Sequence, residues 1–456
     1  MASVTPDLDL KARHRAARLR ALFGVVAVGL GLAALAAAPA SAGRSDTELV
    51  VEAVGVGGVG TSADVLNASM SADARFVAFD SDSPSLHPDD RDDIFDVFVV
   101  DRRLRRTTLV SRATGRRGRK GDEESGDATI SPDGGFVVFD GARDIAPSVP
   151  DGHSSSPLYV RDLARGSTVV VSRASGRRGR LADGASYDPQ ISEGGRYVAF
   201  DSEARNLHPD DRGEGPDVFV RDLRTARTVL VSRASGARGR HGNERSEDAS
   251  MSADGRFVAF ESRASNLHPE DRDGGRDVFV RDLRTHRTVL VNPGKGVATN
   301  PSISPDGRYV AFTYHGAGDL DPADTDRKRD VYLKELRTAE VTLVSRSAGS
   351  SDRASVSQGG RRVVFESTGP DLDPSDTDTA ADVFAWTRAG GTTALVSRAS
   401  GPEGAKATGG RSPTAGDATT TPNGRWVVFE SNATNLDPRD VDEGFDAFLR
   451  DLGPPA

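Results

Sequence analysis

The chain has 456 residues, of which 36% are hydrophobic and 28% charged, and it contains no Cys. Its length allows two ordinary domains or one large repetitive domain, while the absence of Cys excludes disulfide scaffolds, thiolate metal centres and cysteine nucleophiles. The formal net charge of −9 argues against nucleic acid as the main partner, because phosphate binding needs a basic surface.

Residues 1–42 have the pattern of a secretory signal peptide. Five Lys and Arg residues lie between Lys11 and Arg20, an uncharged run covers 21–38, and Ala40 and Ala42 form a small-residue cleavage site. The alternative is an uncleaved membrane anchor, because the apolar run is just long enough to span a bilayer. Cleavage after Ala42 predicts a mature chain that begins at Gly43, is secreted (periplasmic if the source has an outer membrane) and has no membrane span.

One sequence unit recurs seven times along the rest of the chain. Each copy has a turn that follows or varies the pattern Ser-x-Asp-Gly, which is exact in three copies, and then a short apolar run that ends in Phe. These phenylalanines are Phe79, Phe139, Phe200, Phe260, Phe312, Phe365 and Phe429. Two more apolar runs follow in each copy, such as 217–223 and 227–233. Repeats of 52 to 64 residues are too long for parallel solenoids, whose units are about half this length.

Each unit is predicted to form a four-stranded antiparallel sheet. The Gly and Asp of Ser-x-Asp-Gly favour a tight turn, and the few residues before it, such as 188–191, supply the first strand. The almost continuous apolar runs indicate strands that are covered on both faces. Radial packing of such sheets is a β-propeller. We therefore predict an all-β, seven-bladed β-propeller over residues 43–452, with residues 453–456 as a disordered tail.

The seventh unit has no third apolar run after residues 446–452, and the N-terminal part of the mature chain supplies a match. Residues 46–55 carry Thr47, Leu49, Val50, Ala53 and Gly55 in the same register as 227–236. We predict that residues 46–53 form the outer strand of the last blade, which leaves no open sheet edge in the ring.

The repeated Ser-Pro-Asp-Gly-x-x-Val-Ala-Phe and Asp-Val-Phe-Val-x-Asp-Leu segments resemble the WD-repeat-like propeller repeat of the TolB family, over residues 46–452. The resemblance implies a propeller fold and a family that includes periplasmic interaction proteins. TolB itself has an α/β domain before its propeller, and this sequence has only a few residues between the predicted signal peptide and the first strand. Related repeats form the propeller half of prolyl-oligopeptidase-type enzymes, but the Gly-x-Ser-x-Gly motif of their hydrolase domain is not found here.

A recurrent acidic pattern, Asp-x-Asp-x-x-x-Asp, precedes the third strand in five units. The sets are Asp90/Asp92/Asp96, Asp271/Asp273/Asp277, Asp324/Asp326/Asp330, Asp376/Asp378/Asp382 and Asp440/Asp442/Asp446. Such carboxylates can converge on a structural Ca²⁺, which takes about six to eight oxygen ligands. The alternative is that they form Asx turns and pair with Arg. The third unit has Gly213 in place of the middle Asp and should bind a cation most weakly. No other cofactor is indicated.

A second set of residues lies four positions before the Ser or Thr of each turn. Its members are Asn67, Asp127, Asp188, Asp248, Asn300, Arg353 and Asp417. In a propeller these positions circle the mouth of the central channel, where carboxylates attract a cation or a basic group. The alternative is a purely structural role in hydrogen bonds between blades.

Basic residues gather in three of the loops that connect one unit to the next. They include Arg117, Arg119, Arg178, Arg180, Arg238 and Arg240. A one-sided basic arc could bind an anionic polymer or an acidic protein. The alternative is pairing with acidic loops of the same face.

The sequence favours a secreted, monomeric, non-catalytic binding or scaffold propeller that recognises a protein or an anionic cell-envelope polymer through its loop face. No catalytic motif is present, so we assign no catalytic residue. The alternative is a carbohydrate-active propeller enzyme, a lyase or hydrolase, that uses the acids at the channel mouth. Such an enzyme would need a deep pocket with a carboxylate of raised pKa beside Arg or a metal.

Overall fold

The computed structural model describes residues 46–51, 64–150, 155–211, 213, 215–271, 274–316, 318–401, 404–408, 415–440 and 442–455. The chain divides into two compact units, Met1–Ala42 and Gly43–Ala456. The predicted signal peptide and its cleavage site lie outside the described residues. Within the described ranges, no helix is long and apolar enough to cross a bilayer.

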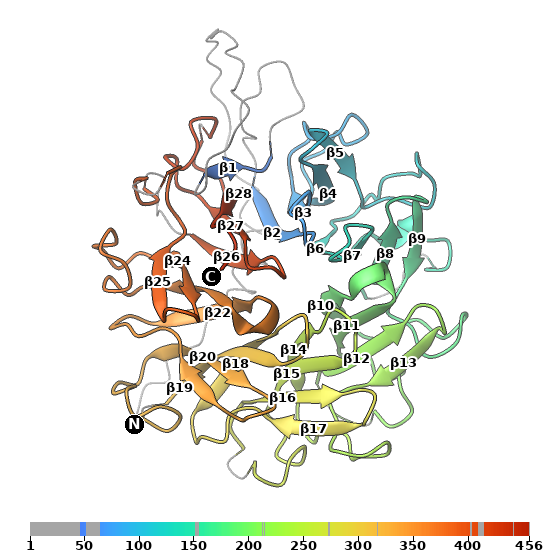
Figure 1. Cartoon of the computed structure of the whole chain (residues 1–456). Helices are drawn as coiled ribbons and strands as arrows, with labels where there is room; N and C mark the ends of the chain where they lie inside the picture. The colour runs from blue at the N-terminus through green and yellow to red at the C-terminus, as the bar shows by residue number, and fades with distance from the viewer. Residues whose placement is uncertain are drawn as a thin grey trace, which may run out of the picture. The chain divides into compact units, whose positions relative to one another are not determined.

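Seven four-stranded antiparallel sheets confirm the predicted β-propeller (Figure 1). The first three blades are β2 (Val65–Met70), β3 (Phe76–Ser81), β4 (Asp96–Asp101), β5 (Arg106–Leu109); β6 (Gly126–Ile130), β7 (Phe136–Asp140), β8 (Leu158–Asp162), β9 (Ser167–Val170); and β10 (Ser186–Ile191), β11 (Tyr197–Ser202), β12 (Asp217–Asp222), β13 (Arg227–Leu230).

The fourth to sixth blades continue the same order. They are β14 (Ser246–Met251), β15 (Phe257–Ser262), β16 (Asp277–Asp282), β17 (Arg287–Leu290); β18 (Val297–Ile303), β19 (Tyr309–His315), β20 (Arg329–Glu335), β21 (Val341–Leu343); and β22 (Ser351–Val356), β23 (Arg362–Ser367), β24 (Asp382–Thr387), β25 (Thr392–Leu395). Three short 3-10 turns accompany the described strands: η1 (Arg143–Ile145), η2 (Glu193–Gly195) and η3 (Gln358–Gly360).

The seventh blade combines both ends of the propeller, as predicted. It consists of β26 (Ala415–Thr420), β27 (Trp426–Ser431), β28 (Asp446–Asp451) and β1 (Thr47–Leu49). Thr47 lies opposite Arg450 and Leu49 opposite Phe448. This strand is shorter than the predicted 46–53, of which residues 52 and 53 lie outside the described part of the chain. Gly453, expected to begin a disordered tail, is buried, and its carbonyl accepts a hydrogen bond from Arg362.

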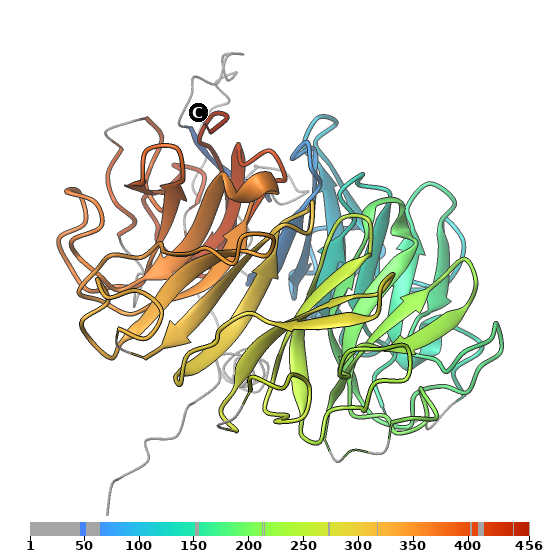
Figure 2. The same cartoon turned by 60° about the horizontal axis from the view of Figure 1, so that its bottom comes forward.

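The core explains the continuous apolar runs. In the middle of each blade an aromatic side chain of the second strand contacts one of the third, as Phe200 does with Phe219 at 5.9 Å between ring centroids. The alternate residues of the same strands pack against the neighbouring blade, so that Val97 and Val99 of blade 1 share a cluster with Ile130 of blade 2. Figure 2 shows the blades packed face to face around the ring. Both faces of each sheet are therefore buried.

A buried arginine on the third strand of four blades was not anticipated. These residues are Arg161, Arg221, Arg281 and Arg450, each at most 4% exposed. Each donates to backbone carbonyls in the loop that leaves the preceding blade, as Arg221 does to Arg173, Ala174 and Gly176. Each of these loops has the sequence Ser-Arg-Ala-Ser/Thr-Gly. The arginine therefore fixes the shape of the loop that connects two blades.

Candidate functional site

The seven predicted channel-mouth positions occupy equivalent places on the innermost strands of the blades. Each lies in a β-bulge, where the pairing of the first and second strands shifts register. All seven have a left-handed backbone, with φ between 45° and 57°. Asp and Asn tolerate this conformation better than other non-glycine residues, which accounts for six of the seven side chains. Arg353 is the exception.

A second set of acidic residues lies on the second strands beside these bulges, and several of its members join neighbouring blades. They directly follow the apolar run of the second strand: Asp80, Asp140, Asp201, Glu261, Glu366 and Glu430. Asp80 accepts the backbone N–H of Asp127 in the next blade at 2.8 Å. Glu366 accepts that of Asp417 at 2.7 Å. Both contacts are hydrogen bonds between blades, which is the structural role named above as the alternative for the channel-mouth residues.

This second acidic set was missed by the sequence analysis, although its signal was present. An acid follows the apolar run in six of the seven units. The exception is blade 5, which has Thr313 at this position, and there Asp352 of blade 6 supplies the carboxylate. Asp352 accepts from the Thr313 hydroxyl at 2.6 Å and from the Asn300 amide at 2.8 Å. The exchange of position keeps one carboxylate at each of these junctions.

The mouth is strongly acidic and contains carboxyl groups with raised pKa. Asp188, Asp201 and Asp248 each place one oxygen within 4.8 Å of the others. Burial, and then the charge of Asp417, raises the pKa of Glu366 to about 8. Arg353 Nη1 lies 2.5 Å from Asp417 and 3.7 Å from Glu366. A carboxyl of raised pKa beside an arginine is thus present at the mouth.

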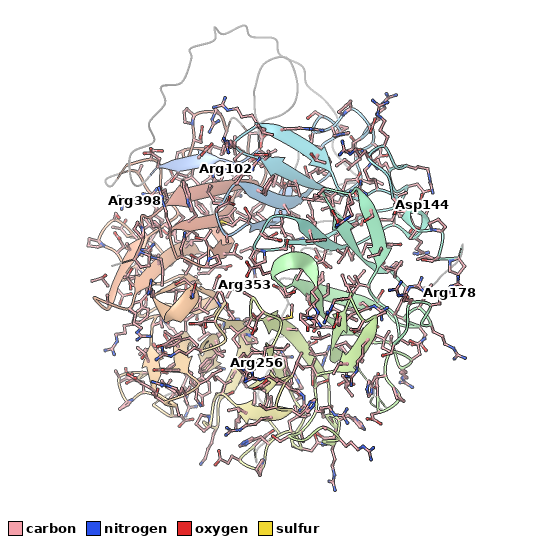
Figure 3. All side chains as sticks on the ribbon, turned by 45° about the vertical axis from the view of Figure 1, so that its right-hand side comes forward. Arg102, Asp144, Arg178, Arg256, Arg353 and Arg398 are labelled. Carbon is pink, nitrogen blue, oxygen red and sulfur yellow. The ribbon has the colours of Figure 1, made fainter. Side chains whose placement is uncertain are left out.

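The arginines predicted to form a basic arc are on the surface. Arg117, Arg119, Arg178, Arg180, Arg238 and Arg240 are all exposed. Figure 3 shows Arg178 at the outer edge and Arg353 toward the middle of the ring. Arg119 forms an ion pair with Asp144 of the next blade. Arg178 therefore lies apart from Arg353 at the channel mouth.

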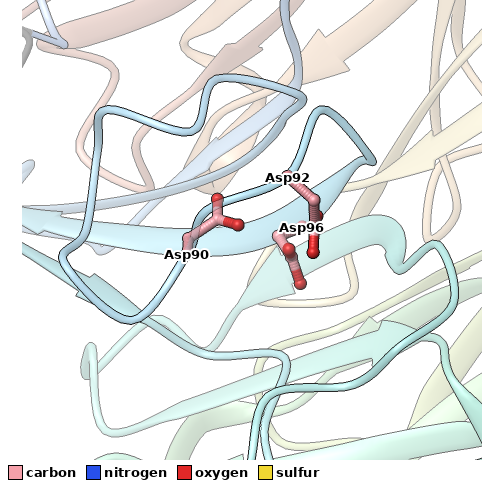
Figure 4. A group of neighbouring side chains, drawn as sticks. All are labelled: Asp90, Asp92 and Asp96. Carbon is pink, nitrogen blue, oxygen red and sulfur yellow. The ribbon is translucent and has the colours of Figure 1, made fainter.

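The acidic loops bring their three carboxylates together in four of the five predicted sets. In blades 1, 5, 6 and 7 each Asp places an oxygen within 4.8 Å of the other two, as Figure 4 shows for Asp90, Asp92 and Asp96. In the blade 4 set, Asp273 lies outside the described residues, and Asp277 accepts a hydrogen bond from Asn292 at 2.5 Å. The predicted convergence of carboxylates is therefore present in these four loops.

In two of these loops the cation is a lysine of the same chain. Lys120 Nζ lies 2.7 Å from Asp96 and 3.0 Å from Asp92 in blade 1. Lys406 Nζ lies 2.6 Å from Asp376 and Asp378, and 2.7 Å from Asp382, in blade 6. The expectation named Arg or Ca²⁺ as the neutralising partner, whereas these blades use Lys. Each of these loops therefore already contains a positive charge supplied by the chain itself.

The acidic loops predict that the propeller is less stable at alkaline than at mildly acidic pH. Burial raises the pKa of Asp217 and of Asp330 to about 7. A carboxyl whose pKa is higher in the folded than in the unfolded state stabilises the fold at low pH, and this contribution is lost as pH rises through the folded value. Asp222 has the opposite shift, to about 2, because hydrogen bonds from Arg196 and backbone amides outweigh its burial.

We therefore expect the melting temperature, measured in chelator, to peak near about pH 5 and to fall toward about pH 8. Below about pH 4 the carboxylates with lowered pKa become protonated and the melting temperature should fall again. Calorimetric melts across this range provide the measurement. A melting temperature that is constant or rises between the two values would contradict the raised pKa values.

Depressions in the described surface lie away from the channel mouth. Tyr309 and Arg388 line them, at the start of β19, which follows the Ser-Pro-Asp-Gly turn, and just after the end of β24. Trp386 lines one of them. Arg388 lies over the Tyr309 ring, 4.8 Å from its centroid. These depressions contain none of the residues singled out from the sequence.

Comparisons with known proteins show the fold. No protein-family model matches the chain. A stretch of 100 residues is 30% identical to dipeptidyl-peptidase 5 of Porphyromonas gingivalis, but it covers only 22% of this chain and 14% of that enzyme. An oligogalacturonate lyase from Vibrio parahaemolyticus is 12% identical with a TM-score of 0.54, over 90% of this chain and 97% of the lyase.

Two further solved structures are similar to this chain. The β-propeller domain of the Trilobed protease from Pyrococcus furiosus has a TM-score of 0.52 and 11% identity, over 87% of this chain and 97% of that domain. It is described as having an open velcro topology, whereas here β1 closes the ring. TolB from Acinetobacter baumannii is 15% identical with a TM-score of 0.39, over 77% of this chain and 67% of TolB. At these identities, the likenesses to the lyase and to the protease domain extend to the propeller fold alone.

Proposed function

We propose that this propeller is a secreted, non-catalytic binding module, whose acidic channel mouth recognises a basic group of a protein partner. The observation that carries the proposal is the ring of left-handed bulges, which presents Asp127, Asp188, Asp248 and Asp417 around one opening. Carboxylates gathered in this way focus a negative potential and attract positive charge. The repeat motif resembles that of the TolB family, which includes periplasmic interaction proteins, and this resemblance supports a role in interaction with other proteins.

The rigidity of the mouth also supports recognition. The backbone N–H of Asp248 donates to Asp201 at 2.6 Å, so the bulge that carries Asp248 is held by the preceding blade. A binding group that is fixed before the ligand arrives loses little entropy on binding. Basic side chains of a partner would therefore meet carboxylates that are already in place.

The test uses a lysine-rich hexapeptide as the probe and its fully acetylated form as the uncharged comparison. We expect the mature protein to bind the charged peptide at low salt, and the double variant Asp188→Asn/Asp248→Asn to weaken binding by at least about tenfold, equivalent to about 1.4 kcal/mol. The matched control is Glu193→Gln/Glu203→Gln, which removes the same charge from exposed positions of the third blade. Equal binding by both double variants, or binding of the acetylated peptide, would contradict the proposal.

A second candidate function is carbohydrate-active catalysis, as a lyase or hydrolase. The observation that favours it is Glu366, whose pKa is raised to about 8 beside Arg353. A carboxyl group of this kind can transfer protons near neutral pH. Because an oligogalacturonate lyase shares the fold, oligogalacturonate is the first substrate to try. Unsaturated products formed by the native protein and not by Glu366→Gln would establish catalysis and overturn the binding-only role.

A further inference from the structure

The acidic loop of blade 7 has the carboxylates of blades 1 and 6 but none of their positive charge. Asp440, Asp442 and Asp446 each place an oxygen within 4.8 Å of the other two. Among the described residues, the charges that act on Asp446 are those of Asp440, Asp442 and Asp64, all of them negative. Within the same ranges, no lysine or arginine forms an ion pair with these three carboxylates, in contrast to Lys120 and Lys406.

Asp446 also lacks the hydrogen-bond donor that its counterparts have. In blades 1, 3, 5 and 6 a serine of the outer strand's end donates to the equivalent aspartate, as Ser397 does to Asp382 at 2.7 Å. In blade 7 that position belongs to the N-terminal strand and is occupied by Val51. Asp446 is 1% exposed, and its Oδ1 is buried without a hydrogen-bond partner among the described residues.

An uncompensated buried carboxylate is costly, so a partner from outside the chain is expected at this point. The available ligands are all carboxylate oxygens, which are the donors that Ca²⁺ prefers. The lysine in blade 6 demonstrates that three aspartates in this arrangement can surround a cation, because Lys406 Nζ lies 2.6–2.7 Å from all three. In blade 1, Lys120 Nζ lies 2.7 and 3.0 Å from two aspartates and 3.8 Å from the third. Backbone carbonyls and water would complete the coordination.

We propose that Asp440, Asp442 and Asp446 bind one Ca²⁺, which stabilises the junction where the ring closes. The site lies beside the first strand of blade 1 as well as β28. Val65 N–H donates to the Phe445 carbonyl at 2.7 Å, and Phe445 N–H donates to Asp64 Oδ1 at 3.1 Å. Asp64 is thus near enough to supply a further oxygen. The ion would link blade 7 to blade 1. Blade 7 is the blade whose outer strand, β1, comes from the other end of the propeller.

The blade 5 loop is a weaker site for the same ion. Tyr332 donates its hydroxyl to Asp324 Oδ2 at 2.8 Å, and Ser345 donates to Asp330 Oδ1 at 2.9 Å. Protein hydroxyls therefore already stabilise two of the three carboxylates. Blade 7 has no counterpart of either contact among the described residues, which makes it the site to test first.

The experiment compares melting temperatures of the mature protein in chelator and in millimolar Ca²⁺. We expect Ca²⁺ to raise the melting temperature of the native protein by about 2 to 5 °C. Asp442→Asn should abolish most of this rise, because it removes a half-buried ligand. The matched control Asp378→Asn changes the same position in blade 6, where Lys406 supplies the positive charge, and should leave the rise intact.

The variant Asp446→Asn gives a second, independent measurement, because it removes the buried carboxylate and keeps the size of the side chain. It should melt in chelator at a temperature no lower than that of the native protein, because an uncompensated buried charge is lost. It should also lose most of the response to Ca²⁺. Identical native melts in chelator and Ca²⁺, or a rise that survives in Asp442→Asn, would overturn the proposal.

Discussion

Removal of residues 43–51 should lower the melting temperature of the propeller by more than about 10 °C or abolish cooperative unfolding. This segment buries Leu49, Val50 and Val51, which are at most 6% exposed. Each such side chain stabilises the fold by about 1.5–3 kcal/mol, so the sum approaches the whole stability of an ordinary domain. The deletion also leaves one edge of β28 unpaired.

Other contacts of β1 point to the same result. The Thr47 hydroxyl donates to the Arg398 carbonyl at 2.6 Å and accepts from Arg450 at 2.5 Å. Leu49 N–H donates to Asp437 of the preceding strand connection at 3.1 Å. The strand is short, but each of its residues is tied to the last blade or to the loop that enters it.

Point variants separate closure from a general effect of truncation. Leu49→Asp places a charge in the core and should approach the effect of the deletion. Glu48→Ala is the matched control, since its side chain is 47% exposed and its contact is an ion pair with Arg102, a kind worth at most about 1 kcal/mol. A deletion variant that melts like the full mature chain would refute a closed ring and favour an open arrangement.

The fold was predictable because each repeat carries its own boundaries. Tight turns at Ser-x-Asp-Gly and continuous apolar runs such as 257–260 specify strand length and two buried faces without reference to distant residues. Closure was predictable for the same reason, since Thr47 and Leu49 reproduce the register of Thr228 and Leu230. The ring positions could be placed at the mouth because they hold a fixed offset from each turn.

What the sequence did not reveal depends on contacts between blades. Glu366 accepts a hydrogen bond from the backbone N–H of Asp417 in the next blade. The sequence does not predict this contact, because an acidic residue at the end of a strand is equally consistent with a solvated side chain. Lys406 neutralises Asp382 from a different loop, so no local pattern connects them. The left-handed backbone of Asp188 arises from a bulge, which alternation along one strand does not disclose.

Replacement of Arg281 by Met should destabilise the propeller by about 3–5 kcal/mol, because the guanidinium is the donor for several buried acceptors. It donates to the carbonyls of Arg233 and Ala234, both at 2.9 Å, and to that of Gly236 at 3.1 Å. Burial lowers the pKa of Arg281 to about 10, which still leaves it charged at neutral pH. Methionine fills much of the volume but offers no donor to any of these oxygens.

The loss of Arg281 should also have a local effect on one loop. This effect distinguishes the loss of these hydrogen bonds from a general packing defect. Without Arg281 the segment 233–240 loses the contacts that fix its turn, so trypsin should cleave after Arg238 or Arg240 well before the rest of the chain unfolds. Arg284→Ala, two residues beyond the strand and exposed, is the control and should change stability by less than about 0.5 kcal/mol. Blade 6, whose preceding loop lacks the Ser-Arg-Ala-Ser/Thr-Gly sequence, has Trp386 at the arginine's position. The arginine therefore accompanies this loop sequence and is not needed by every blade. An Arg281→Met variant with native stability and native proteolysis would contradict the role of Arg281 in fixing the loop.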